Sequence, residues 1–472
     1  MKRTLTAALL ASFLAAGSAR AQVARDTLTY NVAVAPSDFH LSVEARLTSG
    51  AGLLLLSAPP ASGPAGTHVA GLAATDDRGG RLEVLHSGSA WRITVPERGA
   101  VRFRYRLDFN HRLPEGSTGA GFDSLHLYAV TRSLFVAPDP TVYRKLERTY
   151  PVVIVRVLPP SGWRAFAGWP GEDGDYRPES GDDLLGATLA VAPDFRFYGG
   201  TAGRTQWRLA IRGHRYFADS VVIATIRAGL ERATEMLGPA EVQTVTYTSD
   251  VGPKGRTSGS LQGLASIGLI WEPGEVLEVG REHDMMHETL HLWFGGALET
   301  ERWWIEGVTD YVAARLYAAW QNQPEELAQL CWQSLRNYQH IEHRTRMTMA
   351  EESRARMGGD NTELLIYRKG MLAGLMLDAA IRSGSRGRHT LDDLSRRLLA
   401  IAAPRRNHNV REAELHDAAV ALGGADVERV WARVVAGTEL LTEDDVASAL
   451  QGVTGRAFAP PPLAKSRKEL AR

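Results

Sequence analysis

The chain has only one cysteine among its 472 residues, Cys331, so a disulfide within the chain is impossible. Its neighbours Leu330 and Trp332 are apolar, which favours a small buried side chain over a catalytic thiol. Net charge is also missing, because 54 basic residues balance 54 acidic ones. This balance gives no reason to expect nucleic acid or an anionic membrane surface as a partner.

Long hydrophobic runs are also missing from the chain after its N-terminal segment. No stretch there approaches the roughly 20 apolar residues of a membrane-crossing helix. At the N-terminus itself, Lys2 and Arg3 precede an apolar run over residues 5–16 and a small-x-small triplet at 19–21. That run is short for a membrane anchor, and the order is typical of a cleaved signal peptide over residues 1–21. We therefore expect an exported protein, periplasmic or secreted, with no stable membrane insertion after cleavage.

Residues 22–200 are expected to form an all-β, sandwich-like domain. Short runs in which apolar and polar residues alternate recur there, separated by Gly, Pro, Asp and Ser. Clear examples are residues 28–32, 91–95 and 101–105. Alternation with a period of two is the pattern of half-buried strands. The histidines of this region are scattered singly, so we expect no metal site in it.

The sequence changes character after residue 200, where helical periods begin. The expected elements are a helix over 218–237, a strand over 242–248, a Gly-rich loop over 252–263, a strand over 264–271 and helices from 281 to about 450. We expect a mixed, mostly helical catalytic domain over residues 201–455, followed by a flexible tail over 456–472. A β domain followed by such a domain gives the fold class α+β.

The main chemical signal is the segment His287-Glu288-Thr289-Leu290-His291. Two histidines four residues apart lie on one helix face, because four residues turn through about 400°. Both imidazoles can then bind one zinc ion, and Glu288 can act as general base on a water molecule at the ion. Ligands of this type favour zinc over harder divalent ions. A five-residue pattern also occurs by chance, so the residues around it must show whether it marks a metal site.

Glu306 is expected to be the third metal ligand. It lies inside the apolar run over residues 303–311, where a carboxylate is costly unless it is protonated, paired or bound to a metal. Fourteen residues separate it from His291, enough to end one helix, turn and begin an antiparallel one. The alternative is a capping or salt-bridged helix acid.

Two neighbours of these ligands have candidate supporting roles. Asp310 follows Glu306 by four residues and is placed to hold the outer nitrogen of a ligand histidine, with a solvated helix acid as the alternative. His283 precedes His287 by four residues, so a face of three histidines is conceivable. Because two histidines and one glutamate already complete a hydrolytic zinc site, we expect His283 to be structural.

These motifs resemble those of the gluzincin zinc metallopeptidases, most closely the glycyl aminopeptidase family, whose wider relatives include aminopeptidase N. Residues 303–311 are similar to that family's second zinc motif, and residues 366–372 to its Tyr-x-Lys-Gly segment. Further similar segments are residues 377–378, 385–388, 391–394 and 435–439. The resemblance covers about residues 205–455 and, more loosely, the β domain. It implies a thermolysin-like catalytic domain, one zinc ion, a peptide substrate and Tyr367 as a catalytic residue.

The resulting hypothesis is peptide-bond hydrolysis. Glu288 takes a proton from the attacking water and passes it to the leaving amine, and Tyr367 donates to the developing oxyanion. The strand over residues 264–271 is expected to pair with an extended substrate. Without the family resemblance, Tyr367 would be interpreted as an ordinary tyrosine packed on a helix.

Residues 259–263 depart from the resembling family, whose loop there has the sequence Gly-Gly-Leu-Glu-His. Gly259 stands at the position of the first glycine of that loop, and Gln262 stands at the position of the acid. These two are the candidate substrate-binding residues. In aminopeptidase relatives the acid grips the free α-amine of the substrate, whereas Gln262 can hydrogen-bond but cannot neutralise an ammonium group. The spacing between the zinc motifs is also shorter than in the family. Three hypotheses stay open: an aminopeptidase, a zinc peptidase that needs no free N-terminus, and an inactive pseudo-peptidase that binds peptides.

Overall fold

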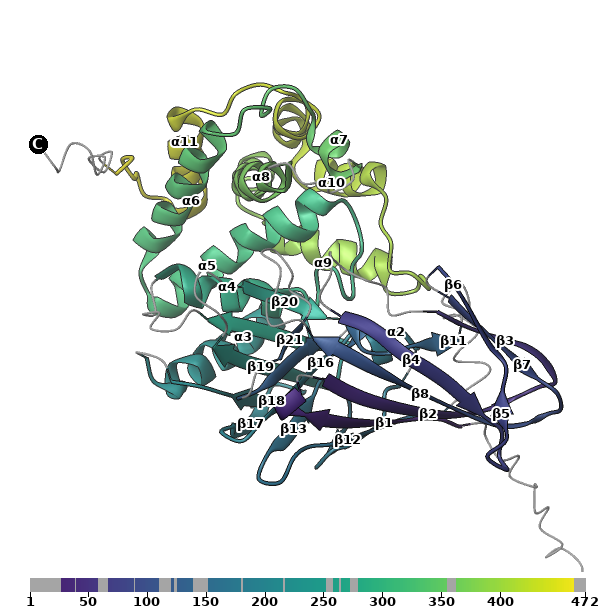
Figure 1. Ribbon diagram of the computed structural model, residues 1–472. Helices are drawn as coiled ribbons and strands as arrows, with labels where there is room; N and C mark the ends of the chain where they lie inside the picture. The colour runs from purple at the N-terminus through teal and green to yellow at the C-terminus, as the bar shows by residue number, and fades with distance from the viewer. Residues whose placement is uncertain are drawn as a thin grey trace, which may run out of the picture.

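The computed structural model describes residues 27–461, except residues 39, 58–66, 89, 110–119, 123–124, 139–151, 180, 215–216, 252–257, 263–264, 272–278 and 355–361. The predicted signal peptide and most of the predicted tail lie outside the described residues. A β-rich N-terminal region lies beside a five-stranded sheet, and helices cover that sheet on the other side (Figure 1). This arrangement confirms the predicted α+β class.

Among the described residues, the N-terminal region forms three sheets. The largest has the strand order β14 (Gly171–Glu172), β15 (Asp175–Tyr176), β12 (Val152–Leu158), β1 (Thr27–Ala35), β2 (His40–Ser49), β8 (Gly99–Phe109), β4 (Thr67–Thr75) and β5 (Arg81–Leu82). The second has the order β13 (Arg164–Ala167), β16 (Thr188–Ala192), β10 (Leu127–Val130) and β9 (Ala120–Phe122). The third has the order β11 (Ala137–Pro138), β3 (Gly52–Ser57), β7 (Ala90–Val95) and β6 (Val84–Ser87). The short helix α2 (Gly181–Leu185) follows β15.

The alternating pattern of the sequence determines which side chains form the core of this region. Every second residue of β1 and of β2 is buried, as a strand with one face on the core requires. The core between the sheets includes the fully buried rings of Tyr30, Phe135 and Trp169. The strands predicted over residues 28–32, 91–95 and 101–105 are confirmed as parts of β1, β7 and β8.

The second region begins with a five-stranded sheet. Its order is β17 (Arg196–Ala202), β18 (Thr205–Ile211), β19 (Thr244–Val251), β21 (Ser266–Trp271) and β20 (Ser258–Gln262). The three inner strands are parallel, and β17 and β20 are antiparallel to their neighbours. The domain boundary expected at residue 200 lies inside β17, which pairs with β18 from Arg196 onwards.

Two expectations about this sheet are wrong. The sequence predicts a Gly-rich loop over residues 252–263, but residues 258–262 form β20. The strand expected to pair with substrate, now β21, has β19 on one side and β20 on the other. Its backbone groups are therefore already paired, and β20 is the outer strand of the described sheet.

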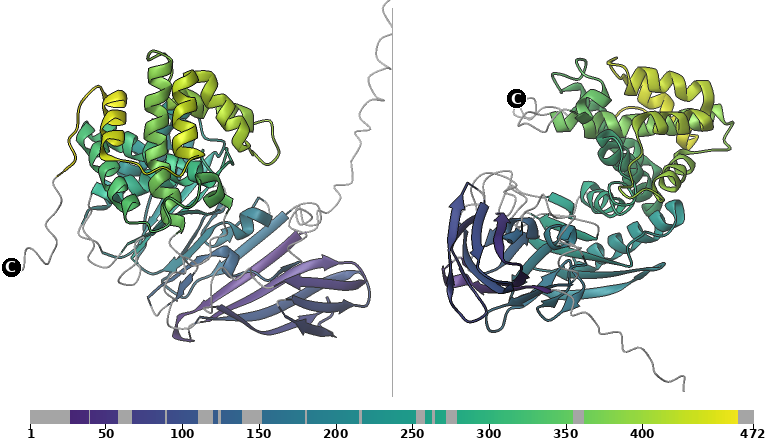
Figure 2. Two further views of the ribbon diagram at one scale, coloured as in Figure 1. Left: turned by 90° about the horizontal axis from the view of Figure 1, so that it is seen from above. Right: turned by 90° about the vertical axis from the view of Figure 1, so that its right-hand side faces the viewer.

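Helices make up most of the remaining chain. They are α3 (Asp219–Leu237), α4 (Val279–Leu290), α5 (Thr309–Gln321), α6 (Pro324–Gln339), α7 (Met349–Arg354), α8 (Thr362–Gly384), α9 (Leu391–Ala402), α10 (Glu412–Val430) and α11 (Glu443–Thr454), with π-helical turns η4 (Trp303–Val308) and η5 (Trp431–Val435). The helix predicted over residues 218–237 is confirmed as α3. Figure 2 shows α8 running through the middle of the helical bundle. In the described part of the chain, no helix combines the length and apolar character needed to span a bilayer.

The two regions are in direct contact across the five-stranded sheet. On β19, the hydroxyl of Tyr247 lies 3.1 Å from the hydroxyl of Thr289 on α4. The hydroxyl of the next residue, Thr248, lies 3.0 Å from the hydroxyl of Thr188 on β16. Successive side chains of a strand point to opposite faces, so α4 covers one face of the sheet and the β region covers the other. A Cβ atom at Gly268 on β21 would collide with Tyr128 of the β region, so the contact depends on this glycine.

Candidate metal centre

Helix α4 carries the first half of the site. It lies between α3 and α5 and contains His287 and Glu288. Its last regular residue is Leu290. The next residue, His291, still follows the helical path, because the N–H groups of Trp293 and Phe294 donate to the carbonyl of Leu290 at 2.9 and 3.0 Å.

The second half of the site lies on the π-helical turn η4, which contains Glu306 and runs directly into α5. Short π-helical turns are rare and occur often at functional sites. The tryptophans before Glu306 are buried in the core that the helices share with the sheet. These anchors fix the turn on the shared core, where the Glu306 carboxylate lies within 3.7 Å of both histidines.

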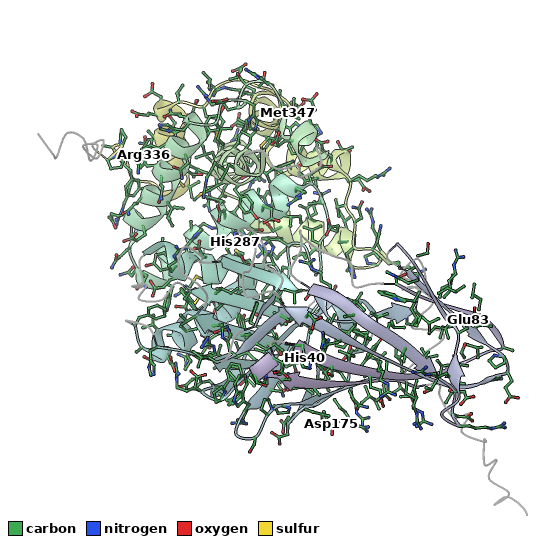
Figure 3. All side chains as sticks on the ribbon, viewed as in Figure 1. His40, Glu83, Asp175, His287, Arg336 and Met347 are labelled. Carbon is green, nitrogen blue, oxygen red and sulfur yellow. The ribbon has the colours of Figure 1, made fainter. Side chains whose placement is uncertain are left out.

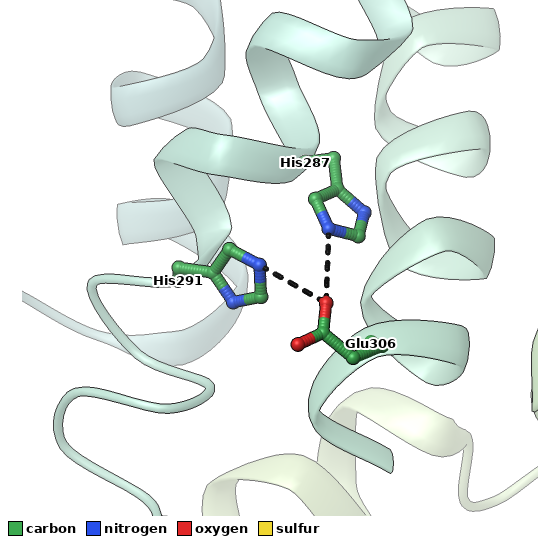
Figure 4. A group of neighbouring side chains, drawn as sticks. All are labelled: His287, His291 and Glu306. Atoms are coloured by element: carbon green, nitrogen blue, oxygen red, sulfur yellow. Dashed lines mark ion pairs between the residues drawn. The ribbon is translucent and has the colours of Figure 1, made fainter. Parts of the chain in front are cut away.

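Three donor atoms converge at this point (Figure 4). Oε2 of Glu306 lies 3.7 Å from Nε2 of His287 and 3.6 Å from Nε2 of His291. One ligand atom from each of the three residues lies within 4.8 Å of the others. The other Glu306 oxygen, Oε1, lies 3.9 Å from the guanidinium of Arg302, a neighbour that sequence reasoning missed. Figure 3 shows His287 between the upper helices and the sheets.

Contacts on the far side of the histidines determine which ring nitrogen carries the proton: a hydrogen bond for His291 and an ion pair for His287. Nδ1 of His291 lies 2.8 Å from the carbonyl oxygen of Phe294, and a carbonyl can only accept. Nδ1 of His287 lies 3.0 Å from Oδ1 of Asp310, which as a carboxylate also accepts. Both Nδ1 atoms therefore carry hydrogen, and in the neutral rings both Nε2 lone pairs point towards Glu306.

The charges around these donors suit one bound cation. Burial lowers the pKa of His287, but Asp310 and Glu306 outweigh burial and hold this pKa well above its usual value. Burial and the charge of His287 lower the pKa of His291 to about 4. Burial raises the pKa of Glu306, but the two histidines outweigh it and bring this pKa down to about 2. Glu306 is therefore ionised, His291 is neutral and His287 carries the one positive charge between the donors. A bound cation would take the place of the His287 proton, because metal ligands must be deprotonated.

Asp310 lies at the start of α5 and is almost fully buried. While Oδ1 faces His287, Oδ2 lies 3.5 Å from the guanidinium of Arg368 on α8. Burial raises the pKa of Asp310, but His287, His283 and Arg368 outweigh burial and bring the pKa down to about 2. The carboxylate is therefore ionised at neutral pH and able to accept from His287. No spacing in the sequence indicated Arg368.

Helix α8 brings Tyr367 to the site. Its ring stacks on that of His287, with centroids 6.1 Å apart and planes at 29°. Burial raises the pKa of Tyr367, and the nearby carboxylate of Glu306, with which its hydroxyl interacts, raises it further. The phenol is therefore protonated at neutral pH and available as a donor. The negative charge of Glu288 also raises the pKa of both Tyr367 and His287.

Solved structures with the same arrangement of elements exist. An aminopeptidase N family protein from Idiomarina loihiensis is 16% identical, with 90% of this chain and 78% of that chain covered at a TM-score of 0.75. An M1 zinc metallopeptidase from Deinococcus radiodurans is also 16% identical, with 89% and 95% covered at a TM-score of 0.56. A mutant of that enzyme bound to a Tyr-Ser-Ala substrate gives a TM-score of 0.57. No family model and no curated protein sequence matches the chain.

The chain has the M1 metallopeptidase fold. This finding confirms, at the level of the fold, the predicted resemblance to aminopeptidase N-like gluzincins. At 16% identity the likeness concerns architecture, so the chemistry of the site must be argued from the residues of this chain.

The donor set of this M1 fold fits a zinc ion. A tetrahedral zinc with bonds of about 2.0–2.2 Å has ligand atoms about 3.3–3.6 Å apart. The separations of 3.6 and 3.7 Å between the carboxylate oxygen and the two imidazole nitrogens are close to this range. Two imidazoles and one carboxylate are also the ligand types of hydrolytic zinc sites, which keep a further position open. A salt bridge between Glu306 and His287 alone gives no physical reason for the lone pair of the neutral His291 to face the same carboxylate oxygen at 3.6 Å.

Gly259 and Gln262 lie on β20, the strand of the M1 fold that is next to α4. Their backbones pair with Leu269 and Ser266 of β21. The structure does not describe their side chains, so their substrate-binding role stays a prediction.

Proposed function

We propose that the protein is a zinc-dependent peptidase that holds one zinc ion with His287, His291 and Glu306. The observation that carries this proposal is the convergence of three donor atoms, at 3.6 and 3.7 Å, with both histidine protons held on the far side of the rings. A structural salt bridge to His287 would not need the lone pair of the neutral His291 at the same oxygen. The M1 fold supports the same interpretation.

When bound, zinc supplies Lewis acidity that activates water and polarises a carbonyl group. Glu288 is the general base in this proposal: it takes a proton from the attacking water and delivers it to the leaving amine. It is next to His287 on α4, so the helix that provides this ligand also positions the base. Asp310 keeps the His287 proton on Nδ1.

Tyr367 stabilises the oxyanion in this mechanism. Its raised pKa keeps the hydroxyl protonated, so it can donate when negative charge develops on the scissile carbonyl oxygen. Its stacking on His287, one of the proposed ligands, supports this role. These two properties distinguish it from a tyrosine that only packs on α8.

The proposed substrate is an extended peptide that pairs with β20. This strand is the outer one in the described sheet and lies next to α4, so its free edge is near the candidate metal centre. The proposal is aminopeptidase-like cleavage, with Gly259 and Gln262 near the substrate N-terminus. The neutral Gln262 favours a second candidate, a zinc peptidase that does not require a free α-amine.

Export to a periplasm or to the medium is part of the proposal, based on the N-terminal pattern over residues 1–21. Sequencing the N-terminus of the protein after expression in a bacterium tests it. The expected first residue is Gln22, and a mature chain that still begins at Met1 would contradict export by this route.

Metal analysis combined with peptide hydrolysis tests the enzymatic proposal. We expect one zinc per chain and hydrolysis of small Ala and Gly peptides that a chelator abolishes and added zinc restores. His291→Ala should lose both zinc and activity, whereas His389→Ala, whose side chain is 42% exposed, should keep both. Hydrolysis that survives complete zinc removal would reject the zinc mechanism, and zinc binding without hydrolysis of any peptide would favour the pseudo-peptidase.

Paired substrates separate the two peptidase candidates. A peptide and its N-acetylated form should be cleaved at very different rates by an aminopeptidase, because acetylation removes the charged amine. Equal rates would instead support the enzyme that needs no free N-terminus.

A further inference from the structure

His283 lies one helical turn before His287 on α4 and is 5% exposed. It makes two contacts with Asp310 on α5. Its Nε2 atom lies 3.0 Å from the carbonyl oxygen of Asp310 and 3.6 Å from Oδ1 of the Asp310 side chain. It is therefore connected to both the backbone and the carboxylate of the residue that faces His287.

The direction of this hydrogen bond follows from its acceptor. A carbonyl oxygen has no hydrogen, so Nε2 of His283 must be the donor to Asp310. The other ring nitrogen, Nδ1, lies 3.4 Å from a carboxylate oxygen of Asp284. The donor position on Nε2 is consequently fixed by the fold.

Asp310 is in this way held from several directions. His283 fixes its backbone carbonyl, and Arg368 lies 3.5 Å from Oδ2. The remaining oxygen, Oδ1, is then directed at Nδ1 of His287 at 3.0 Å. Since the orientation and tautomer of His287 depend on this contact, a shift of Asp310 would move the Nε2 lone pair away from the other donors.

We propose that His283 is a positioning residue of the metal centre, acting through Asp310 on the orientation of His287. The inference rests on the proposed zinc site, and it goes further by assigning metal affinity to a residue that does not reach the metal. Supporting residues around metal ligands typically contribute about 10- to 100-fold in metal affinity. His283 is the part of this support that comes from α4 itself, so the helix that carries His287 also holds the partner of that ligand.

Two amide substitutions form a matched pair for the test. In His283→Gln the amide nitrogen takes a place close to that of Nε2 and can donate to the Asp310 carbonyl. In His283→Asn the side chain is one methylene shorter and its amide nitrogen cannot reach that carbonyl. Both replacements are polar and uncharged, so a difference between them reports the contact with Asp310.

The measurement is zinc affinity by competition with a chromogenic chelator, together with the visible absorption spectrum of the cobalt-loaded protein. We expect His283→Asn to bind zinc about 10- to 100-fold more weakly than the wild type and to show an altered cobalt spectrum. His283→Gln should retain most of the affinity. Tyr247→Phe serves as the control, because it removes a hydroxyl that lies 3.1 Å from Thr289 on α4 without touching Asp310. It should lower thermal stability and leave zinc affinity unchanged.

Equal zinc affinity in the Asn and Gln variants would overturn the role of His283, and so would a loss in Tyr247→Phe as large as that in His283→Asn. A separate measurement, zinc binding by His287→Ala, tests the proposed metal site itself. If the wild type and His287→Ala bind zinc equally, the metal site itself is wrong; if only His287→Ala loses zinc, the site stands and the result for His283 can be judged alone.

Discussion

Gly307 and Gly370 meet face to face where the turn η4 crosses helix α8. A Cβ atom added to Gly370 would lie 2.8 Å from Cα of Gly307 and 2.8 Å from the carbonyl oxygen of Trp303. Backbone atoms cannot swing aside, so the two segments can approach this closely only through glycine. Gly307 directly follows Glu306, and Gly370 is three residues after Tyr367. The contact therefore sets the distance between the third metal ligand and the proposed oxyanion donor.

Gly370→Ala is expected to lower the free energy of unfolding by about 1–3 kcal/mol, since overpacking at a backbone contact forces η4 and α8 apart. It should also reduce zinc affinity and turnover together. Thermal unfolding and metal analysis check this. The control is Gly229→Ala in α3, where an added Cβ would meet Met286 at an ordinary 3.5 Å and should be tolerated. Equal stability of the two variants would contradict the role of the glycine pair.

Glu288→Gln is expected to retain one zinc ion and the wild-type fold while lowering the turnover number by about two to four orders of magnitude. The amide keeps the size of the side chain but cannot accept the proton of the attacking water at neutral pH. Zinc content and steady-state hydrolysis of an unblocked peptide are the measurements. Full activity in this variant would remove Glu288 from the chemistry.

Tyr367→Phe is expected to lower the turnover number by about a hundredfold or more while KM changes little, because the hydroxyl acts when charge develops on the carbonyl oxygen. The phenyl ring preserves the stacking on His287, so zinc content should not change. Tyr198→Phe is the control: that hydroxyl contacts Asp219 at 2.9 Å, far from the site in sequence. A turnover number for Tyr367→Phe equal to that of Tyr198→Phe would reject the assigned role.

Lys369→Met is expected to change how stability depends on pH. Lys369 is fully buried, its ammonium donates to the Gly437 carbonyl at 2.9 Å, and burial lowers its pKa from 10.5 to about 8. Between pH 8 and 10.5 the unfolded chain therefore holds a proton that the folded chain has released. Stability relative to the Met variant should rise with pH across that window, by on the order of 3 kcal/mol in total, and be flat below it.

Urea unfolding of both proteins at several pH values across this window checks the prediction. The comparison between the two proteins cancels the other groups that titrate in the same range. A difference in unfolding free energy that stays constant with pH would show that Lys369 keeps its proton when the chain folds.

Local patterns predicted a large part of this molecule. The alternation in residues 28–32 and 101–105 indicated strands, and both are present in β1 and β8. The spacing of His287 and His291 indicated a shared face, because four residues make slightly more than one helical turn. Such geometry depends only on neighbours in the chain.

The expectations about the substrate strand failed for a physical reason. Residues 258–262 contain glycine and serine, which favour turns, so their own preference indicated a loop. In the fold, pairing with β21 provides backbone hydrogen bonds that outweigh this preference, and β20 becomes the outer strand. Strand order across a sheet cannot be predicted from a local period.

The sequence by itself determined the chemical types of the donors and the one-turn spacing of the two histidines, since covalent geometry and helix pitch act over a few residues. Only the tertiary structure decided where the proton of each ring lies, because the acceptors are the Phe294 carbonyl beyond the helix end and Asp310 on another helix. It also decided that Gly307 meets Gly370, a contact between segments distant in the chain. The proton positions and the glycine contact depend on how α4, η4, α5 and α8 pack around one core, and no short stretch of sequence specifies that packing.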